Sequence, residues 1–146
     1  MKEDTAQSIT PPTRADHLHT IIEHARSLPH EVCGVLIGQR DPLRIEQIVA
    51  ARNVHEQPQQ HYLVDAAALL HADDLVHSTG QEIVGFYHSH PHGAAVPSPH
   101  DLRAAWPGYV YIIAAFADDV PYVCAWVVDE RQQVRPGPWN PYHHKR

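Results

Sequence analysis

Short apolar segments rich in β-branched residues recur along this sequence, and they limit the folds that it can adopt. Turn-forming residues flank these segments, which is typical of strands. The stretch Asp-Asp-Val-Pro at 118–121 joins two of them and predicts a hairpin. The predicted strands cover residues 32–38, 43–54, 83–87, 109–117 and 122–128, and Val134 begins a last short one.

Three segments between these strands have helical rather than alternating spacing. Residues 15–28 repeat their apolar positions every three or four residues, and Asp16 is the expected N-cap. A second helix is expected between Asp65 as its N-cap and Gly80 as its end, with an apolar side formed by Ala66, Leu69, Leu70 and Val76. Helices mixed with hairpin-linked strands predict a mixed sheet with packed helices, hence an α/β or α+β domain.

A third, short helix is predicted over 98–105. Ser98 is its expected N-cap, Pro99 occupies the first helical position and Asp101 the third. The helix is expected to end before Pro107, because the residue preceding a proline disfavours the helical conformation.

Length and composition exclude several other classes of protein. The 146 residues fit one domain, and 43% hydrophobic residues are ordinary for a globular protein. A net charge of −6 with 11 scattered Lys and Arg residues disfavours a nucleic-acid partner. No apolar run reaches the roughly 18 residues of a membrane span, and the N-terminus resembles no secretory signal. Two cysteines, Cys33 and Cys124, cannot form a disulfide framework, so we expect core thiols in a reduced, cytoplasmic protein.

The chain divides into three parts by composition. Residues 1–13 are polar and are expected to form a flexible N-terminal lead-in, residues 14–135 the domain, and residues 136–146 a Pro-rich C-terminal tail. No internal repeat or low-complexity linker suggests a further division.

The chain has 14 histidines, and most of them are expected to be solvated. His88 and His90 differ because they end an apolar strand two positions apart, which directs both imidazoles to one face. Asp101 follows in the first turn of the predicted short helix. Two His and one Asp are suitable ligands for Zn²⁺, and three protein ligands leave a fourth position for water, as in catalytic sites.

Each of these residues also has an ordinary interpretation. A His-x-His pair on a strand is more often a surface feature, and Asp101 alone would be a first-turn helix acid. His92 is an alternative fourth ligand that would close the open position, whereas His100 is expected at the surface. A zinc deaminase would need His-x-Glu and Pro-Cys-x-x-Cys, which the sequence lacks, and the His-Glu-x-x-His motif of other zinc proteases is also absent.

Two separate motifs together resemble the JAMM (MPN+) metalloprotease family. The first is Pro29-His30-Glu31-Val32-Cys33-Gly34, followed by apolar residues and Gly38. The second is His88-Ser89-His90, ten further residues and Asp101, with Ser98 at the position of the family's serine. The resemblance extends over residues 14–130.

The resemblance implies a fold and a set of roles. The fold would be α/β, with a mixed, curved β-sheet packed by helices, similar to the JAMM and cytidine-deaminase-like fold. One catalytic Zn²⁺ would be bound by His88, His90 and Asp101. Glu31 would bind the catalytic water, take its proton and pass it to the leaving amine, while Ser98 would donate a hydrogen bond to the oxyanion.

The resemblance also implies a class of substrate. The chain has no long insertion between its motifs, so it is more similar to the small bacterial members, which cleave after the C-terminal Gly-Gly of ubiquitin-like sulfur-carrier proteins. Arg14, Asn53 and the segment 62–65 are also similar to that subgroup. A deubiquitinase-like isopeptidase and a non-catalytic MPN scaffold are the alternatives. The sequence leaves the oligomeric state open, with a homodimer as one option.

Overall fold

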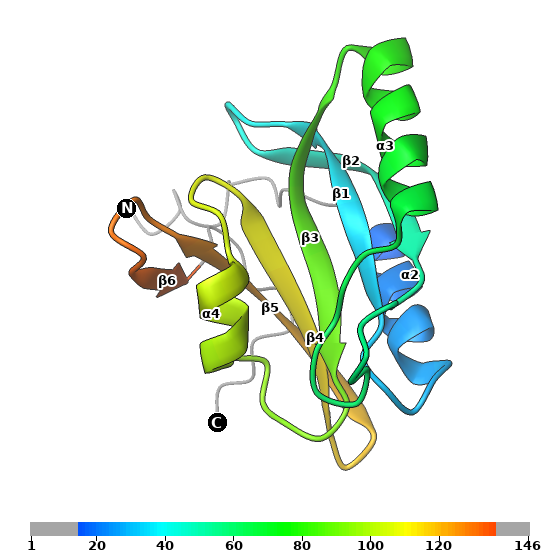
Figure 1. Cartoon of the computed structure of the whole chain (residues 1–146), viewed down its shortest axis with the longest axis vertical. Helices are drawn as coiled ribbons and strands as arrows, with labels where there is room; N and C mark the ends of the chain where they lie inside the picture. The colour runs from blue at the N-terminus through cyan, green and yellow to red at the C-terminus, as the bar shows by residue number, and fades with distance from the viewer. Residues whose placement is uncertain (1–14, 137–146) are drawn as a thin grey trace, which may run out of the picture.

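A six-stranded mixed sheet forms the centre of the protein in the computed structural model, which describes residues 15–136 (Figure 1). The strand order is β2-β1-β3-β4-β5-β6; β3 and β4 are parallel and the other neighbours antiparallel. The predicted α/β fold is confirmed. The lead-in 1–13 lies outside the described residues, as does the predicted tail 136–146 apart from Pro136, which ends β6. The strands are β1 (Cys33–Gln39), β2 (Arg44–Ala51), β3 (Glu82–His90), β4 (Val110–Ala117), β5 (Val120–Val128) and β6 (Val134–Pro136).

The connections between strands follow from local sequence. Asp118 and Asp119 form the tight turn between β4 and β5 with φ of 52° and 69°. Positive φ at both central residues is the requirement of a type I′ hairpin turn, and Asp tolerates it. Parallel strands need a crossover instead, and α4 (Pro99–Ala104) lies in the connection from β3 to β4.

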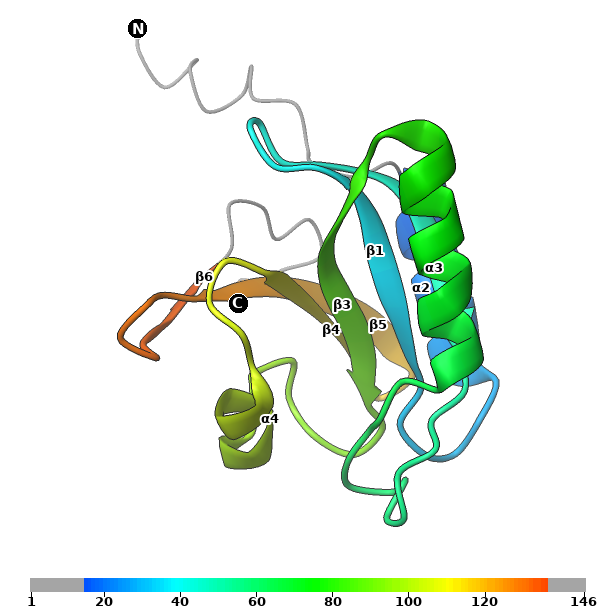
Figure 2. The same ribbon diagram turned by 45° about the horizontal axis from the view of Figure 1, so that its top comes forward.

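Helix α2 (Ala15–Arg26) covers one face of the sheet, while α3 (Ala66–Thr79) and α4 lie on the other (Figure 2). The apolar stripe of α2 packs on the sheet as predicted, through Leu18, Ile21, Ile22 and Ala25. The prediction of Asp16 as N-cap is wrong. Asp16 lies inside the first helical turn, where its carboxylate interacts favourably with the positive end of the helix dipole.

Helix α3 has the predicted ends, but of its predicted apolar side only Val76 packs against the core among the larger side chains, and the two leucines do not. Asp65 accepts a hydrogen bond from the Ala68 N–H, and Gly80 ends the helix with φ of 75°. Its buried residues are Ala68 and Ala72, whereas Leu69 and Leu70 are 40% and 67% exposed. The two alanines let the helix lie close to β1 and β2, which turns the leucines outward.

Strand β3 is longer than predicted and carries chemistry-bearing residues at its C-terminal end. Side chains alternate along a strand, so Tyr87 joins the core beneath α2, and His88 and His90 point to the face of α3 and α4. Glycine is needed opposite Tyr87, because a Cβ on Gly34 would collide with the Tyr87 ring. Among the described residues, no helix is long and apolar enough to cross a membrane.

Candidate metal centre and active site

Strand β3 and helix α4 bring three potential metal ligands together. The Nε2 atoms of His88 and His90 lie 3.1 Å apart, and each lies 3.1 Å from Oδ2 of Asp101. Ligands of a tetrahedral zinc ion are about 3.3 Å apart, given Zn–N and Zn–O bonds of ~2.0–2.1 Å. The three atoms therefore have nearly the spacing of one face of a zinc tetrahedron. Among residues 15–136, this is the one group of three or more His, Cys, Asp or Glu side chains with ligand atoms this close together.

The capping box of α4 fixes the position of Asp101. Ser98 Oγ accepts a hydrogen bond from the Asp101 N–H at 3.0 Å, and the Ser98 N–H donates to Asp101 Oδ2 at 2.9 Å. This reciprocal pair holds the carboxylate at the start of the helix. The Ser98 hydroxyl hydrogen remains available for donation, because Oγ serves only as an acceptor within the box.

The two histidines are oriented by different means. Nδ1 of His90 lies 2.7 Å from the Ala94 carbonyl, to which it donates, and this hydrogen bond leaves Nε2 as the ring nitrogen that faces Asp101. Nδ1 of His88 is buried with no hydrogen-bond partner among the described residues. The ring of Tyr62 instead stacks on His88, with centroids 4.4 Å apart and an interplanar angle of 21°.

Charge in this group favours a bound cation. Burial lowers the pKa of His88, which therefore stays neutral as a metal ligand must. Burial alone would raise the pKa of Asp101, but hydrogen bonds with His88 and His90 hold it well below its usual range. Burial disfavours the charged form of His90, but the hydrogen bond with Asp101 stabilises it. The pKa of His90 is therefore raised overall. An ionised carboxylate beside a neutral imidazole is a donor set suited to Zn²⁺.

Glu31 lies just before β1 and is only 5% exposed. Its Oε1 is buried and has no hydrogen-bond partner in the described part of the chain. Burial raises the pKa of Glu31 to about 7, while the charge of His90 lowers it and that of Asp101 raises it. A carboxyl group with a pKa near neutrality suits a general acid and base.

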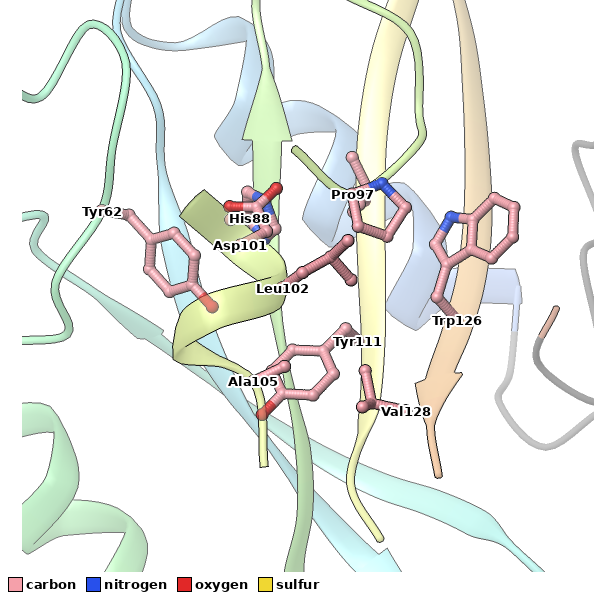
Figure 3. A pocket seen from close by; sticks show the side chains of 10 residues that line it. Tyr62, His88, Pro97, Asp101, Leu102, Ala105, Tyr111, Trp126 and Val128 are labelled. Atoms are coloured by element: carbon pink, nitrogen blue, oxygen red, sulfur yellow. The ribbon is translucent and has the colours of Figure 1, made fainter. Parts of the chain in front are cut away.

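A narrow apolar pocket lies beside His88 and Asp101 (Figure 3). In this view Tyr62 faces His88 and Asp101, while Leu102 and Tyr111 lie below them. The pocket holds about 10 Å³, the room of about one water molecule. Little bulk water can reach the ligand atoms from this side.

The structure separates the other candidates from this group. Cys33 is fully buried, and burial raises the pKa of its thiol to about 12, so the expectation of an inert core cysteine agrees with its surroundings. His92 is exposed and does not join the group of ligand atoms. His100 also stays outside the group of ligand atoms; it is half-buried, with its ring stacked on His61 at a centroid distance of 3.8 Å. The loop from 53 to 64 folds against α4, which the periodicity of the sequence does not indicate.

Comparison with known proteins identifies the family. The family model described as prokaryotic homologs of the JAB domain matches residues 14–135. This chain belongs to the prokaryotic JAB family. A desampylase from Haloferax volcanii is 37% identical to this JAB protein over an alignment of 126 residues, and the match covers 82% of this chain and 90% of the relative.

Other relatives of this JAB protein agree with that assignment. A probable TtuB-protein conjugate cleaving protease from Thermus thermophilus is 37% identical over 109 residues, covering 75% of this chain and 69% of the relative. A solution structure of a Desulfitobacterium hafniense protein matches with a TM-score of 0.74 and 26% identity, over 91% of this chain and 98% of the other. The expected relationship to JAMM-type peptidases is thereby confirmed, because the named relatives are enzymes of this type.

Two residues near the centre were not predicted to contribute to it. Ser89, between the two histidines, accepts a hydrogen bond from the Val32 N–H at 2.9 Å and so ties the Glu31 segment to β3. The sequence marks Tyr62 only as part of the segment 62–65, which is similar to the small bacterial family members, yet its ring covers His88. The sequence signal for Ser89 was its place inside His-x-His, where its side chain must point away from both histidines.

Proposed function

We propose that this JAB-family chain is a zinc-dependent metallopeptidase that cleaves the peptide or isopeptide bond after the C-terminal Gly-Gly of a ubiquitin-like sulfur-carrier protein. The observation that carries the proposal is the 3.1 Å triangle of ligand atoms from His88, His90 and Asp101, together with the buried Oε1 of Glu31, which has no hydrogen-bond partner among the described residues. A non-catalytic scaffold needs neither feature.

The donor set supports zinc as the metal. Two imidazole nitrogens and one carboxylate oxygen form an open three-ligand set of the kind found in catalytic zinc sites. When bound, zinc supplies Lewis-acid chemistry, which polarises a carbonyl group and lowers the pKa of water to about 7.

The chain's own residues would handle the proton and the developing charge. Glu31, with a pKa of about 7, takes the proton of the attacking water through its free Oε1 and delivers it to the leaving amine. The Ser98 hydroxyl, which keeps its hydrogen available, donates to the oxyanion of the tetrahedral intermediate. The apolar pocket beside Tyr62 limits access of bulk water to His88 and Asp101 from that side.

The substrate class follows from relatives and from the shape of the site. The names of two relatives describe a desampylase and a protease that cleaves TtuB-protein conjugates. Gly-Gly suits a confined site because it has no side chains. A reduced compartment, the cytoplasm, agrees with the burial of both cysteine side chains.

The test uses one carrier protein with two kinds of scissile bond. A ubiquitin-like carrier is extended past Gly-Gly by one to three residues, and a second sample is linked through Gly-Gly to a lysine side chain. Both are incubated with the zinc-loaded enzyme and followed by intact-mass spectrometry, with and without a chelator. We expect cleavage after Gly-Gly that the chelator abolishes. Neither substrate being cleaved by a protein shown to hold one zinc would refute the proposed substrate class.

A further inference from the structure

Within the described residues, the Glu31 backbone is held by more hydrogen bonds than its carboxylate oxygen Oε1. Its Oε1 makes no hydrogen bond in the described part of the chain. The backbone is correspondingly well fixed: the Glu31 N–H donates to the Pro58 carbonyl at 2.9 Å, and the Glu31 carbonyl accepts from Nδ2 of Asn53 at 2.9 Å. On the other side, Ser89 holds Val32.

Asn53 uses every hydrogen-bonding position of its side chain. Nδ2 donates to the carbonyls of Glu31 and His61, both at 2.9 Å. Oδ1 accepts from the N–H groups of His55 and Leu63, both at 3.0 Å. An amide offers two donor and two acceptor positions, and all four are satisfied by backbone groups here.

These four bonds join two parts of the site that are distant along the sequence. One partner is Glu31 itself, and the other three lie in the loop that carries Pro58 and Tyr62. The same loop therefore holds the Glu31 N–H through Pro58 and covers His88 with the Tyr62 ring. The Asn53 amide thus connects the Glu31 carbonyl directly to this loop.

We propose that Asn53 is the positioning residue for Glu31, holding the proposed general base at the distance and angle that proton transfer requires. The inference rests on the proposed function of Glu31. It assigns Asn53 no contact with the substrate or the metal. Its effect therefore falls on turnover rather than on substrate binding or metal coordination.

The chemistry of the site explains why asparagine is required. Aspartate at this position would keep the two acceptor contacts to His55 and Leu63, but its second oxygen would face two carbonyl oxygens and could donate to neither. Alanine would remove all four contacts. Both substitutions remove the 2.9 Å hydrogen bond to the Glu31 carbonyl and leave it only the longer 3.3 Å contact with His30 Nδ1 among the described residues. A displacement of about 1 Å in a reacting group can lower turnover by about 100-fold.

The experiment compares Asn53→Asp and Asn53→Ala with Arg40→Ala as the matched control. Arg40 also donates hydrogen bonds to backbone carbonyls, those of Ile83 and Gly108. It follows the C-terminal end of β1, whereas Glu31 precedes the N-terminal end. Each variant is tested in four ways: thermal unfolding without metal, the visible absorption spectrum of the Co²⁺-substituted protein, and kcat and KM on the extended carrier.

We expect both Asn53 variants to lower kcat by about 10- to 100-fold with KM and the Co²⁺ spectrum unchanged. Arg40→Ala is expected to lower the unfolding temperature and to leave kcat unchanged. If Asn53→Ala does not fold, Asn53→Asp decides, because it retains two of the four hydrogen bonds. A wild-type kcat in a folded Asn53 variant would overturn the inference, as would an altered Co²⁺ spectrum or an equal loss of kcat in Arg40→Ala. Full activity of Glu31→Gln, measured alongside, would instead overturn the proposed function.

Discussion

Replacing Tyr62 tests whether ring stacking holds the candidate metal ligand His88. The His88 ring is 1% exposed and its Nδ1 has no hydrogen-bond partner among the described residues, so the Tyr62 ring, stacked at 4.4 Å, restrains its plane. Tyr62→Leu keeps apolar volume but loses the stacking. An aromatic pair contributes about 0.5–1.5 kcal/mol beyond area burial. This range corresponds to about a 2- to 12-fold weakening of metal binding.

The assay is competition for Zn²⁺ between the protein and a chromogenic chelator at constant pH. Tyr62→Phe is the matched control because it retains the ring and removes only the hydroxyl, and we expect its zinc affinity to stay within about twofold of wild type. Thermal unfolding of the metal-free proteins verifies that both variants fold. Equal affinity of Tyr62→Leu and wild type would refute the role of stacking, and equal losses in both variants would assign the effect to the hydroxyl instead.

Three further predictions concern stability. Burial raises the pKa of Glu31 from 4.5 to about 7, so its ionised form destabilises the metal-free fold increasingly as the pH rises through this window. Glu31→Gln should therefore stabilise the metal-free protein at pH 8 by about 1–3 kcal/mol and have little effect at pH 4.5, as checked by denaturant unfolding at both pH values. Gly34→Ala should destabilise the fold by about 1–3 kcal/mol in the same assay, because its Cβ would collide with the Tyr87 ring; an unchanged midpoint would contradict that packing. Tyr87→Phe should cost about 1 kcal/mol, since it removes the 2.7 Å hydrogen bond between the Tyr87 hydroxyl and His24 Nδ1, and a wild-type unfolding midpoint would show that the bond contributes nothing.

Local rules were sufficient to predict the grouping of the three ligand atoms. Alternation along a strand places His88 and His90 on one face, and the Ser98 capping box fixes the start of the helix that carries Asp101. Glu31 entered only through resemblance to the JAMM family, because no spacing rule relates it to residues more than fifty positions away. In the structure Glu31 lies close enough to His90 and Asp101 for their charges to shift its pKa.

The path of the loop between β2 and α3 could not be predicted from the sequence. Its polar composition predicts a loop but not its path, and that path creates the Tyr62–His88 and His61–His100 stacks as well as the four bonds of Asn53. The prediction of which leucines of α3 are buried was wrong for a related reason. Periodicity offers an alanine side and a leucine side, and the close approach of the sheet, rather than hydrophobicity, selects the alanines.

The proposal of a metallopeptidase with Glu31 as general base is tested most directly by single-turnover cleavage of the extended carrier. Wild type and Glu31→Gln are compared after both are shown to hold one zinc. We expect Glu31→Gln to retain zinc and substrate binding and to cleave about 10²- to 10⁴-fold more slowly, the usual contribution of a positioned acid–base group. Cleavage at the wild-type rate by zinc-loaded Glu31→Gln would contradict the proposed mechanism.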